Sequence, residues 1–293
     1  MAAGLSASAQ FANTFPRLIL ETKLTLSQIG AMKQAVTTIP LEPGNGLQIH
    51  IPTWTQPTAY TLTEGIDMAQ AQQISDADFS VTVAENAGVQ VILTRLAMRA
   101  MKGDTMQMAA RSMANALEKK RDQDLLSLNS GFSAGLGSAG TVMGIGHLMA
   151  GKVRLQNNTR PIEGAIQGVF HPYQLHGLYE DLLTVSSGAL GSIGLSAGSM
   201  QEELIRNYEM FNLAGIAMTS DPNITVDGSD DAVGAMFAKM ALIYVPFEDE
   251  DLEDEYDSSM RATELNLVAT YGYGEYADTW GRTMTFDAAT PSS

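Results

Sequence analysis

Alternating apolar and polar positions dominate the chain between residues 46 and 94. Every second residue is apolar in 47–51, and the same alternation runs through 79–83 and again through 89–93. A period of two predicts β-strands with one apolar face. More than 20 mostly polar residues join the outgoing and returning arms, so the pattern predicts a long β-hairpin. An isolated two-stranded ribbon is marginally stable in water, and we therefore expect this hairpin to lie on another surface.

A different spacing follows the hairpin. Between residues 104 and 129, apolar residues recur at intervals of three and four, which predicts one long amphipathic helix. Asp104 or Thr105 is a candidate N-cap, and Gly131 is a candidate stop. At 1.5 Å per residue, such a helix spans about 37 Å.

The rest of the chain predicts a mixture of helices and strands. Residues 1–45 have scattered apolar anchors and are expected to form an arm with a short helix, and 131–160 are Gly-rich and expected to be loose. The further expected elements are strands at 166–172 and 214–220, helices at 173–185 and 199–211, a helix that becomes a strand at 231–247, and two strands joined by a turn at 262–287.

Composition restricts the classes of protein. The length of 293 residues fits one large domain or two modest ones, and zero cysteines exclude disulfides and thiolate metal sites. No apolar run approaches the roughly 20 residues of a membrane span.

Charge is unevenly distributed. The net charge is −16, and residues 207–293 carry 17 acidic but only 3 basic side chains. This acidity argues against tight, general binding of nucleic acid, whose phosphates repel it. Residues 95–121, most of which belong to the predicted helix, are locally basic.

The acidic tract 248–257 has eight carboxylates in ten residues. We interpret it as a solvated loop. Calcium binding lacks the spacing and glycine of the twelve-residue calcium loop. A docking patch for a basic partner, or charge control near a pore or packaged nucleic acid, stays open.

Two further patterns were considered as functional sites. Gly135–Gly140 reads GLGSAG and matches a dinucleotide fingerprint, but a helix precedes it and more glycines follow, so we interpret it as a flexible linker. His171 and His176 lie near Glu180 and Asp181, but five residues do not place two ligands on one helix face. With neither a GxSxG motif nor a cysteine nucleophile, we predict no catalytic, cofactor-binding or metal site.

The order of these parts resembles the major capsid proteins of tailed bacteriophages, which share the Hong Kong-97-type fold. Residues 116–131 (ALEKKRDQDLLSLNSG) look like the end of the family's spine helix, and 170–182 (FHPYQLHGLYEDL) look like the start of its axial domain. Residues 269–288 (ATYGYGEYADTWGRTMTFDA) look like its closing Tyr-Gly segment.

The resemblance implies an α+β fold with five parts. These are an N-terminal arm (1–45), an extended loop made of a long β-hairpin (46–94), a peripheral domain with the spine helix (95–134), an axial domain (135–257) and closing strands of the peripheral domain with the C-terminus (258–293).

The implied function is a shell subunit. The chain is expected to assemble with itself into hexamers and pentamers of an icosahedral virion shell around double-stranded DNA, in the cytoplasm of a bacterial host. Expected partners are a scaffolding protein, a portal protein, a possible decoration protein and weakly contacted DNA, with no membrane and no cofactor. The candidate inter-subunit contacts are Phe11, Phe15, Trp54, Tyr60, Glu64, Asp67, Lys119, Lys120 and Arg121.

Two departures refine this expectation. Some members cross-link covalently through a lysine of the extended loop, but residues 46–94 contain no lysine, so we expect a shell held by non-covalent contacts. Some members begin with an acidic scaffolding segment that is cleaved away, whereas this chain starts almost directly with the arm, which implies a separate scaffolding protein or a mature form.

Three alternatives remain at this stage. An encapsulin-like compartment would have the same fold around a protein cargo. A nucleotide-binding enzyme would use Gly135–Gly140, and a monomeric binding module would not assemble at all.

Overall fold

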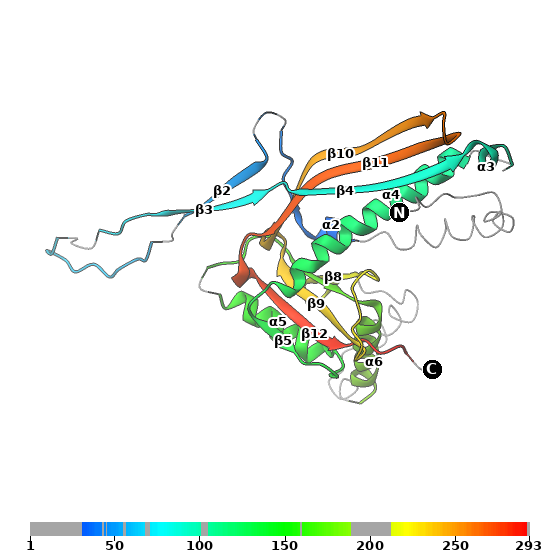
Figure 1. Cartoon of the computed structure of the whole chain (residues 1–293). Helices are drawn as coiled ribbons and strands as arrows, with labels where there is room; N and C mark the ends of the chain where they lie inside the picture. The colour runs from blue at the N-terminus through cyan, green and yellow to red at the C-terminus, as the bar shows by residue number, and fades with distance from the viewer. Residues whose placement is uncertain are drawn as a thin grey trace.

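The computed structural model describes residues 31–291, except for 43, 45, 55–56, 68–70, 101–104, 159 and 189–211. Within this part, helices and strands form an α+β fold with two main sheets and a projecting ribbon (Figure 1). Most of the predicted arm and the predicted helix at 199–211 lie outside the described residues.

The first main sheet has four strands and one long helix against it. In order across the sheet, the strands are β1 (Thr37–Thr38), β10 (Leu242–Asp257), β11 (Ala262–Glu275) and β4 (Glu85–Thr94). The helix α4 (Thr105–Ser127) packs against it, and Met113 and Leu117 join Leu265 and Leu267 of β11 in one buried cluster. The predicted long helix is therefore confirmed, and at 1.5 Å per residue it spans about 35 Å. The short α3 (Arg95–Ala100) connects β4 towards it.

The second main sheet has six strands. Their order is β5 (Gly135–Gly137), β12 (Gly281–Asp287), β9 (Asp231–Ala238), β6 (Ile166–Phe170), β8 (Ile216–Ser220) and β7 (Asn212–Leu213). The helices α5 (Ile145–Gln156) and α6 (Pro172–Gly188) cover one face of this sheet. Leu148 of α5 and Leu178 of α6 are fully buried there with Met236 and Met284. The predicted strands at 166–172 and 214–220 and the predicted helix at 173–185 are confirmed.

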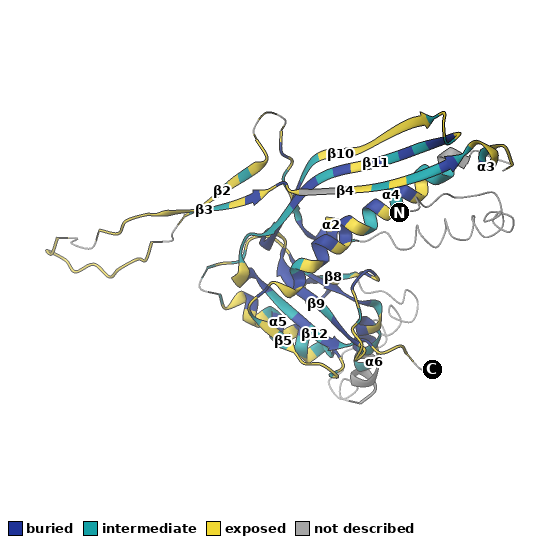
Figure 2. Ribbon diagram, viewed as in Figure 1, coloured by how far each residue is buried: buried dark blue, intermediate teal, exposed yellow. Residues whose placement is uncertain are grey.

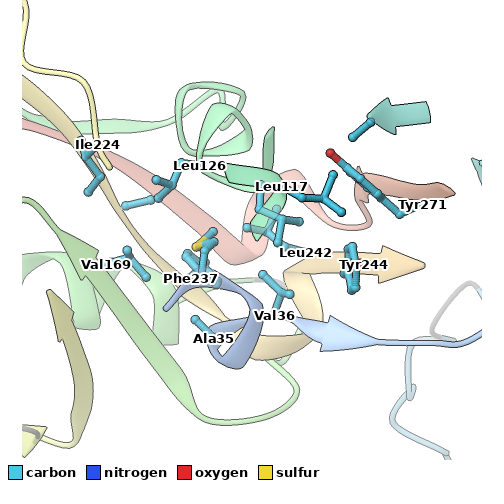
Figure 3. Close-up of a cluster of buried hydrophobic side chains, with 14 of the residues drawn as sticks. Ala35, Val36, Leu117, Leu126, Val169, Ile224, Phe237, Leu242, Tyr244 and Tyr271 are labelled. Carbon is cyan, nitrogen blue, oxygen red and sulfur yellow. The ribbon is translucent and has the colours of Figure 1, made fainter. Parts of the chain in front are cut away.

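One buried cluster joins the two sheets. Figure 3 shows Leu117 and Leu126 of α4 above Phe237 of the six-stranded sheet, with Leu242 of the four-stranded sheet beside them. The helix α2 (Met32–Ala35) completes this cluster, and Met32 is fully buried. The two sheets therefore share a core, and the short helix α2 is part of it.

The predicted hairpin is confirmed only in part. The strands β2 (Gln48–Trp54) and β3 (Asp76–Thr82) pair in antiparallel fashion, with Trp54 opposite Asp76. The returning arm does not continue along β2, because β4 pairs with β11 instead. Both β3 and β4 have one covered face, so both show the same alternation of apolar and polar residues. This pattern does not identify the strand with which either of them pairs.

Two other expectations are wrong. Residues 231–238 form the strand β9 and not a helix. Both faces of β9 are buried, and hydrophobic periodicity does not distinguish such a strand from a buried helix. Residues 145–156 form α5 within the stretch expected to be loose. The two strands expected at 262–287 are confirmed, and β11 and β12 belong to different sheets.

Candidate assembly surfaces

The β2–β3 ribbon is attached to the body of the protein along one apolar face. Ile49, Ile51 and Phe79 pack on a small cluster that includes the buried side chains of Ile243 and Val245 in β10. A hydrogen bond from the backbone N–H of Val83 to the carbonyl of Leu47 closes the base of the ribbon at 2.8 Å. The sequence alternation therefore anchors one end of the ribbon and leaves the other end to project.

The loop beyond the ribbon extends well away from the rest of the chain (Figure 1). Its described residues, 57–67 and 71–75, are exposed (Figure 2). Two hydrogen bonds cross this loop, from the N–H of Thr58 to Gln72 Oε1 at 2.8 Å and from Gln72 Nε2 to the carbonyl of Thr58 at 2.6 Å. The two sides of the loop are thus joined by their own hydrogen bonds, and the described loop residues do not pack on the core.

Large apolar side chains are concentrated on this projecting part. Trp54, at the end of β2, is 70% exposed, and Leu62 and Ile66 are 63% and 71% exposed. Tyr60 and Ile74 are also exposed. A group of exposed apolar side chains on one projection is typical of a surface that another protein covers.

The candidate contacts named from the sequence divide into three groups. The structure places Trp54, Tyr60, Glu64 and Asp67 in the exposed ribbon and loop. Phe11 and Phe15 lie outside the described residues. Sequence reasoning missed Leu62, Ile66 and Ile74, although apolar residues within a polar stretch were a visible signal.

The third group lies on α4. Lys120 is exposed and forms an ion pair with Asp124 one turn further along the helix, and Lys119 is half-buried. Arg121 is only 4% exposed. The side chain of Arg121 is thus covered within its own chain, and its contact with another subunit stays a prediction.

Arg121 connects α4 to both long strands of the four-stranded sheet. Its guanidinium forms an ion pair with Glu118, lies 3.6 Å from Glu250 Oε1 and stacks 5.6 Å from the ring centre of Tyr271. Burial, together with the hydrogen bond and charge of Glu118, raises the pKa of Glu250, and the charges of Arg121 and Lys33 oppose this shift. The arginine is therefore a structural cation between two carboxyl groups.

The acidic tract forms a strand and not the expected loop, and along the tract this strand lies at the edge of the sheet formed by the described residues. Residues 248–257 belong to β10 and pair with β11 on one side, for example Glu253 with Asn266 and Glu255 with Glu264. The partner on the other side, β1, pairs only with Ile243 and Tyr244. Carboxylates on an open edge discourage further strand pairing, because an approaching strand would have to bury them.

Gly135–Gly140 is also not a flexible linker. Gly135–Gly137 form the strand β5, which pairs in parallel with Thr283–Thr285 of β12. A side chain at Gly137 would lie 2.4 Å from the carbonyl oxygen of Thr285, and its φ is +89°. A glycine at position 137 is thus required for the close approach of β5 and β12. The strand–turn–helix context of a dinucleotide site is absent here, because a loop separates Gly140 from α5.

The two histidines considered as metal ligands lie in a region with structural contacts. His171 Nδ1 accepts a hydrogen bond from the N–H of Tyr173 at 3.2 Å. Asp181 Oδ2 accepts one from the N–H of Ile145 at 2.9 Å, at the start of α5. No group of three or more potential ligands is present in the described part of the chain. Among the described helices, none has both the length and the apolar character for crossing a membrane.

Comparison with known proteins finds similarity in structure only. No family model and no curated protein sequence matches the chain. The capsid structure of the cyanophage P-SCSP1u is 13% identical and has a TM-score of 0.67, with 89% of each chain covered. The head structure of Helicobacter pylori bacteriophage KHP40 is 9% identical with a TM-score of 0.70, covering 87% of this chain and 89% of that one.

A third solved structure agrees with these two. The capsid of Ralstonia phage GP4 is 11% identical with a TM-score of 0.67 and covers 92% of both chains. The shared arrangement extends over nearly the whole chain in each case. The chain therefore has the fold of tailed-phage capsid proteins, as the order of elements in the sequence predicted.

Proposed function

We propose that this chain, which has the capsid fold, is the major capsid protein of a tailed bacteriophage. Many copies would form the icosahedral head shell, as hexamers and pentamers, around double-stranded DNA. The role is structural and not catalytic. The observation that carries this proposal is the projecting ribbon and loop with exposed apolar side chains on a chain that has a capsid fold from end to end.

The proposed mechanism is interlocking of neighbouring subunits. A side chain such as Ile66 gains nothing from exposure to water, and covering it with a second copy removes apolar surface from solvent. Each contact is modest, but symmetry repeats it at every subunit of a closed shell. With no lysine between residues 46 and 94, these contacts are non-covalent.

The parts of the chain receive proposed roles, with corrected boundaries. The ribbon and loop over 46–83 are the extended loop, and α4 is the spine helix of a peripheral domain that includes the four-stranded sheet. The six-stranded sheet with α5 and α6 is the axial domain, and β12 belongs to it rather than to the peripheral domain. The segment before Ala31, which is the proposed arm, lies outside the described residues.

The other proposed partners follow from the same role. A scaffolding protein, a portal protein and a decoration protein would act during or after assembly in the host cytoplasm. Contact with DNA would be weak and non-specific because the net charge of −16 repels phosphates.

Electron microscopy of the purified protein tests the proposal. We expect closed shells from the intact chain. Residues 55–75 can be replaced by Asn-Gly, which closes a two-residue hairpin between the paired Trp54 and Asp76. This variant should remain folded and soluble but should not build closed shells. Normal shells from the shortened variant would contradict the proposed role of the loop.

The contents of particles produced during infection test the proposal that the shell encloses double-stranded DNA. Packaged DNA is the expected content. A defined protein cargo without DNA would instead identify an encapsulin-like compartment.

A further inference from the structure

Two buried carboxyl groups meet where α4 reaches the six-stranded sheet. Asp122 of α4 is 4% exposed, and Asp221, directly after β8, is fully buried. Asn223 contacts both side chains, because its backbone N–H donates to Asp221 Oδ1 at 2.9 Å and its side chain donates to Asp122. Two carboxyl groups held together in a buried site repel each other when both are charged, which favours a proton on one of them.

The pair connects three separate parts of the chain. Asp122 Oδ1 accepts a hydrogen bond from the N–H of Met32 at 3.1 Å, and Asp221 Oδ2 accepts one from the N–H of Ala31 at 3.2 Å. Asn223 Nδ2 donates to Asp122 Oδ2 at 3.0 Å. The beginning of α2, the C-terminal part of α4 and the segment after β8 are thus joined at one point.

Among the described residues, no lysine, arginine or histidine forms an ion pair with Asp122 or Asp221. His171, at the end of β6, acts electrostatically on Asp221, but burial lowers the pKa of its imidazole. Lys33 of α2 lies 4.0 Å from Glu118 on the other side. Burial raises the pKa of Asp122 to about 7, and the charge of Asp221 and its hydrogen bond add to this shift.

A second carboxyl pair lies at the same boundary between the sheets. Glu275 ends β11, and Asp278 begins the short helix η5 (Asp278–Trp280) that leads into β12. Burial and the charge and hydrogen bond of Asp278 raise the pKa of Glu275 to about 7. Asp278 also accepts a hydrogen bond from the N–H of Ser133 at 2.7 Å, and the charge of Arg282 acts on it. A carboxyl pair therefore lies at two places where the two sheets meet.

We propose that Asp122 and Asp221 form a proton-dependent joint that holds α2 and α4 to the six-stranded sheet, and that loss of the proton on this pair loosens it. This role goes beyond shell formation and does not depend on it. With both carboxyl groups charged, their repulsion separates α4 from the segment after β8 and weakens the attachment of Ala31 and Met32.

The direction of the pH effect follows from the raised pKa of Asp122. An open joint exposes the carboxyl group, which then ionises at its ordinary value of 3.8. The closed joint is therefore fully stable at low pH and loses stability as the pH rises to about 7. By linkage, the equilibrium for opening rises by up to about 50-fold from about pH 5 to about pH 7 and then reaches a plateau.

Hydrogen exchange of the full-length protein, detected by mass spectrometry, tests this joint. Protection of amides in residues 31–36 and 221–226 is measured across this pH range and corrected for intrinsic exchange. Strand β9 serves as the internal reference. We expect the protection of the two segments to fall by tens of fold relative to β9. Equal pH dependence in the joint and in β9 would overturn the proposal.

Substitution of the pair provides the second arm of the test. Asp122→Asn removes the second negative charge and keeps an acceptor for Met32, but it loses the acceptor for the side chain of Asn223. It should give protection that no longer depends on pH. Asp221→Asn removes the same repulsion and serves if the first variant does not fold. Asp254→Asn, which removes an exposed charge from β10, should retain the wild-type profile. A wild-type profile in a folded variant of the pair would also overturn the proposal.

Discussion

The exposed apolar side chains of the projecting loop permit a quantitative prediction about assembly. We consider the triple variant Tyr60→Ser, Leu62→Ser and Ile66→Ser. All three side chains are at least half exposed, with values of 50%, 63% and 71%. Full burial of such a side chain contributes about 1.5–3 kcal/mol, so covering the exposed part of each contributes about 1–2 kcal/mol. The three together contribute about 4 kcal/mol to each contact between subunits, which corresponds to about a thousand-fold in the association constant.

The same change should leave the isolated fold almost unaffected. These side chains lie outside the buried clusters, and substitutions at exposed sites generally change the free energy of unfolding by less than about 0.5 kcal/mol. Light scattering and sedimentation would measure the lowest protein concentration that gives shells, and chemical denaturation would measure stability. The matched control is Tyr60→Phe, Leu62→Met and Ile66→Val, which retains apolar character at the same positions.

The two measurements together decide whether the reasoning holds. We expect the serine variant to need a much higher concentration for assembly and the apolar control to resemble the original protein. Assembly of the serine variant at the original concentration would refute the role of this surface. A large loss of folding stability would show that the loop packs within its own chain.

Three further predictions concern stability. Gly137→Ala should destabilise the fold by more than about 2 kcal/mol, because the added methyl group meets the neighbouring strand. Gly140→Ala, where φ is +70° and the space is open, should cost about 1 kcal/mol. Thermal unfolding would measure both losses of stability, and equal losses would contradict the packing argument. Arg121→Leu should cost about 1 kcal/mol in chemical denaturation, because the carboxyl groups of Glu118 and Glu250 are partly exposed and solvent screens their ion pairs with the guanidinium. An unchanged midpoint would show that this cation is dispensable. Glu275→Gln should raise the free energy of unfolding by about 1 kcal/mol above about pH 7 and by less at lower pH. The raised pKa of Glu275 makes the original protein lose stability as the pH rises from about 4.5 to about 7, and the neutral amide avoids this loss. An increase that does not vary with pH would exclude this cause.

Local periodicity was sufficient for several elements of the fold. The helix α4 has an apolar repeat that only one face of a helix satisfies, and the paired strands β2 and β3 alternate with a period of two. The order of these elements also led to the correct fold. Local signals failed for α5, because Gly146 and Gly151 reduce its helix propensity. Gly151 instead permits a close approach of Met236, whose Cε would lie 3.1 Å from a Cβ at that position.

The candidate surface was also predictable in part. Trp54 and Tyr60 stood out as large apolar residues in a polar region, and the structure leaves both exposed. The burial of Arg121 was not predicted, because a charged residue in a helix looks the same in sequence whether its side chain lies in water or is buried beside a carboxyl group of another element. The distinction depends on Glu250, which approaches only when β10 folds beside α4.

The amino-acid sequence by itself determined the periodic elements such as α4, β2 and β3, the uneven charge and the absence of lysine from residues 46–94. Tertiary structure alone decided which strand pairs with β4, the edge position of the acidic tract and the meeting of Asp122 with Asp221. The physical reason is the distance along the chain over which each interaction acts. Helical and strand periods are set by neighbouring residues, whereas strand partners and buried charges depend on groups that folding brings together from distant parts of the chain.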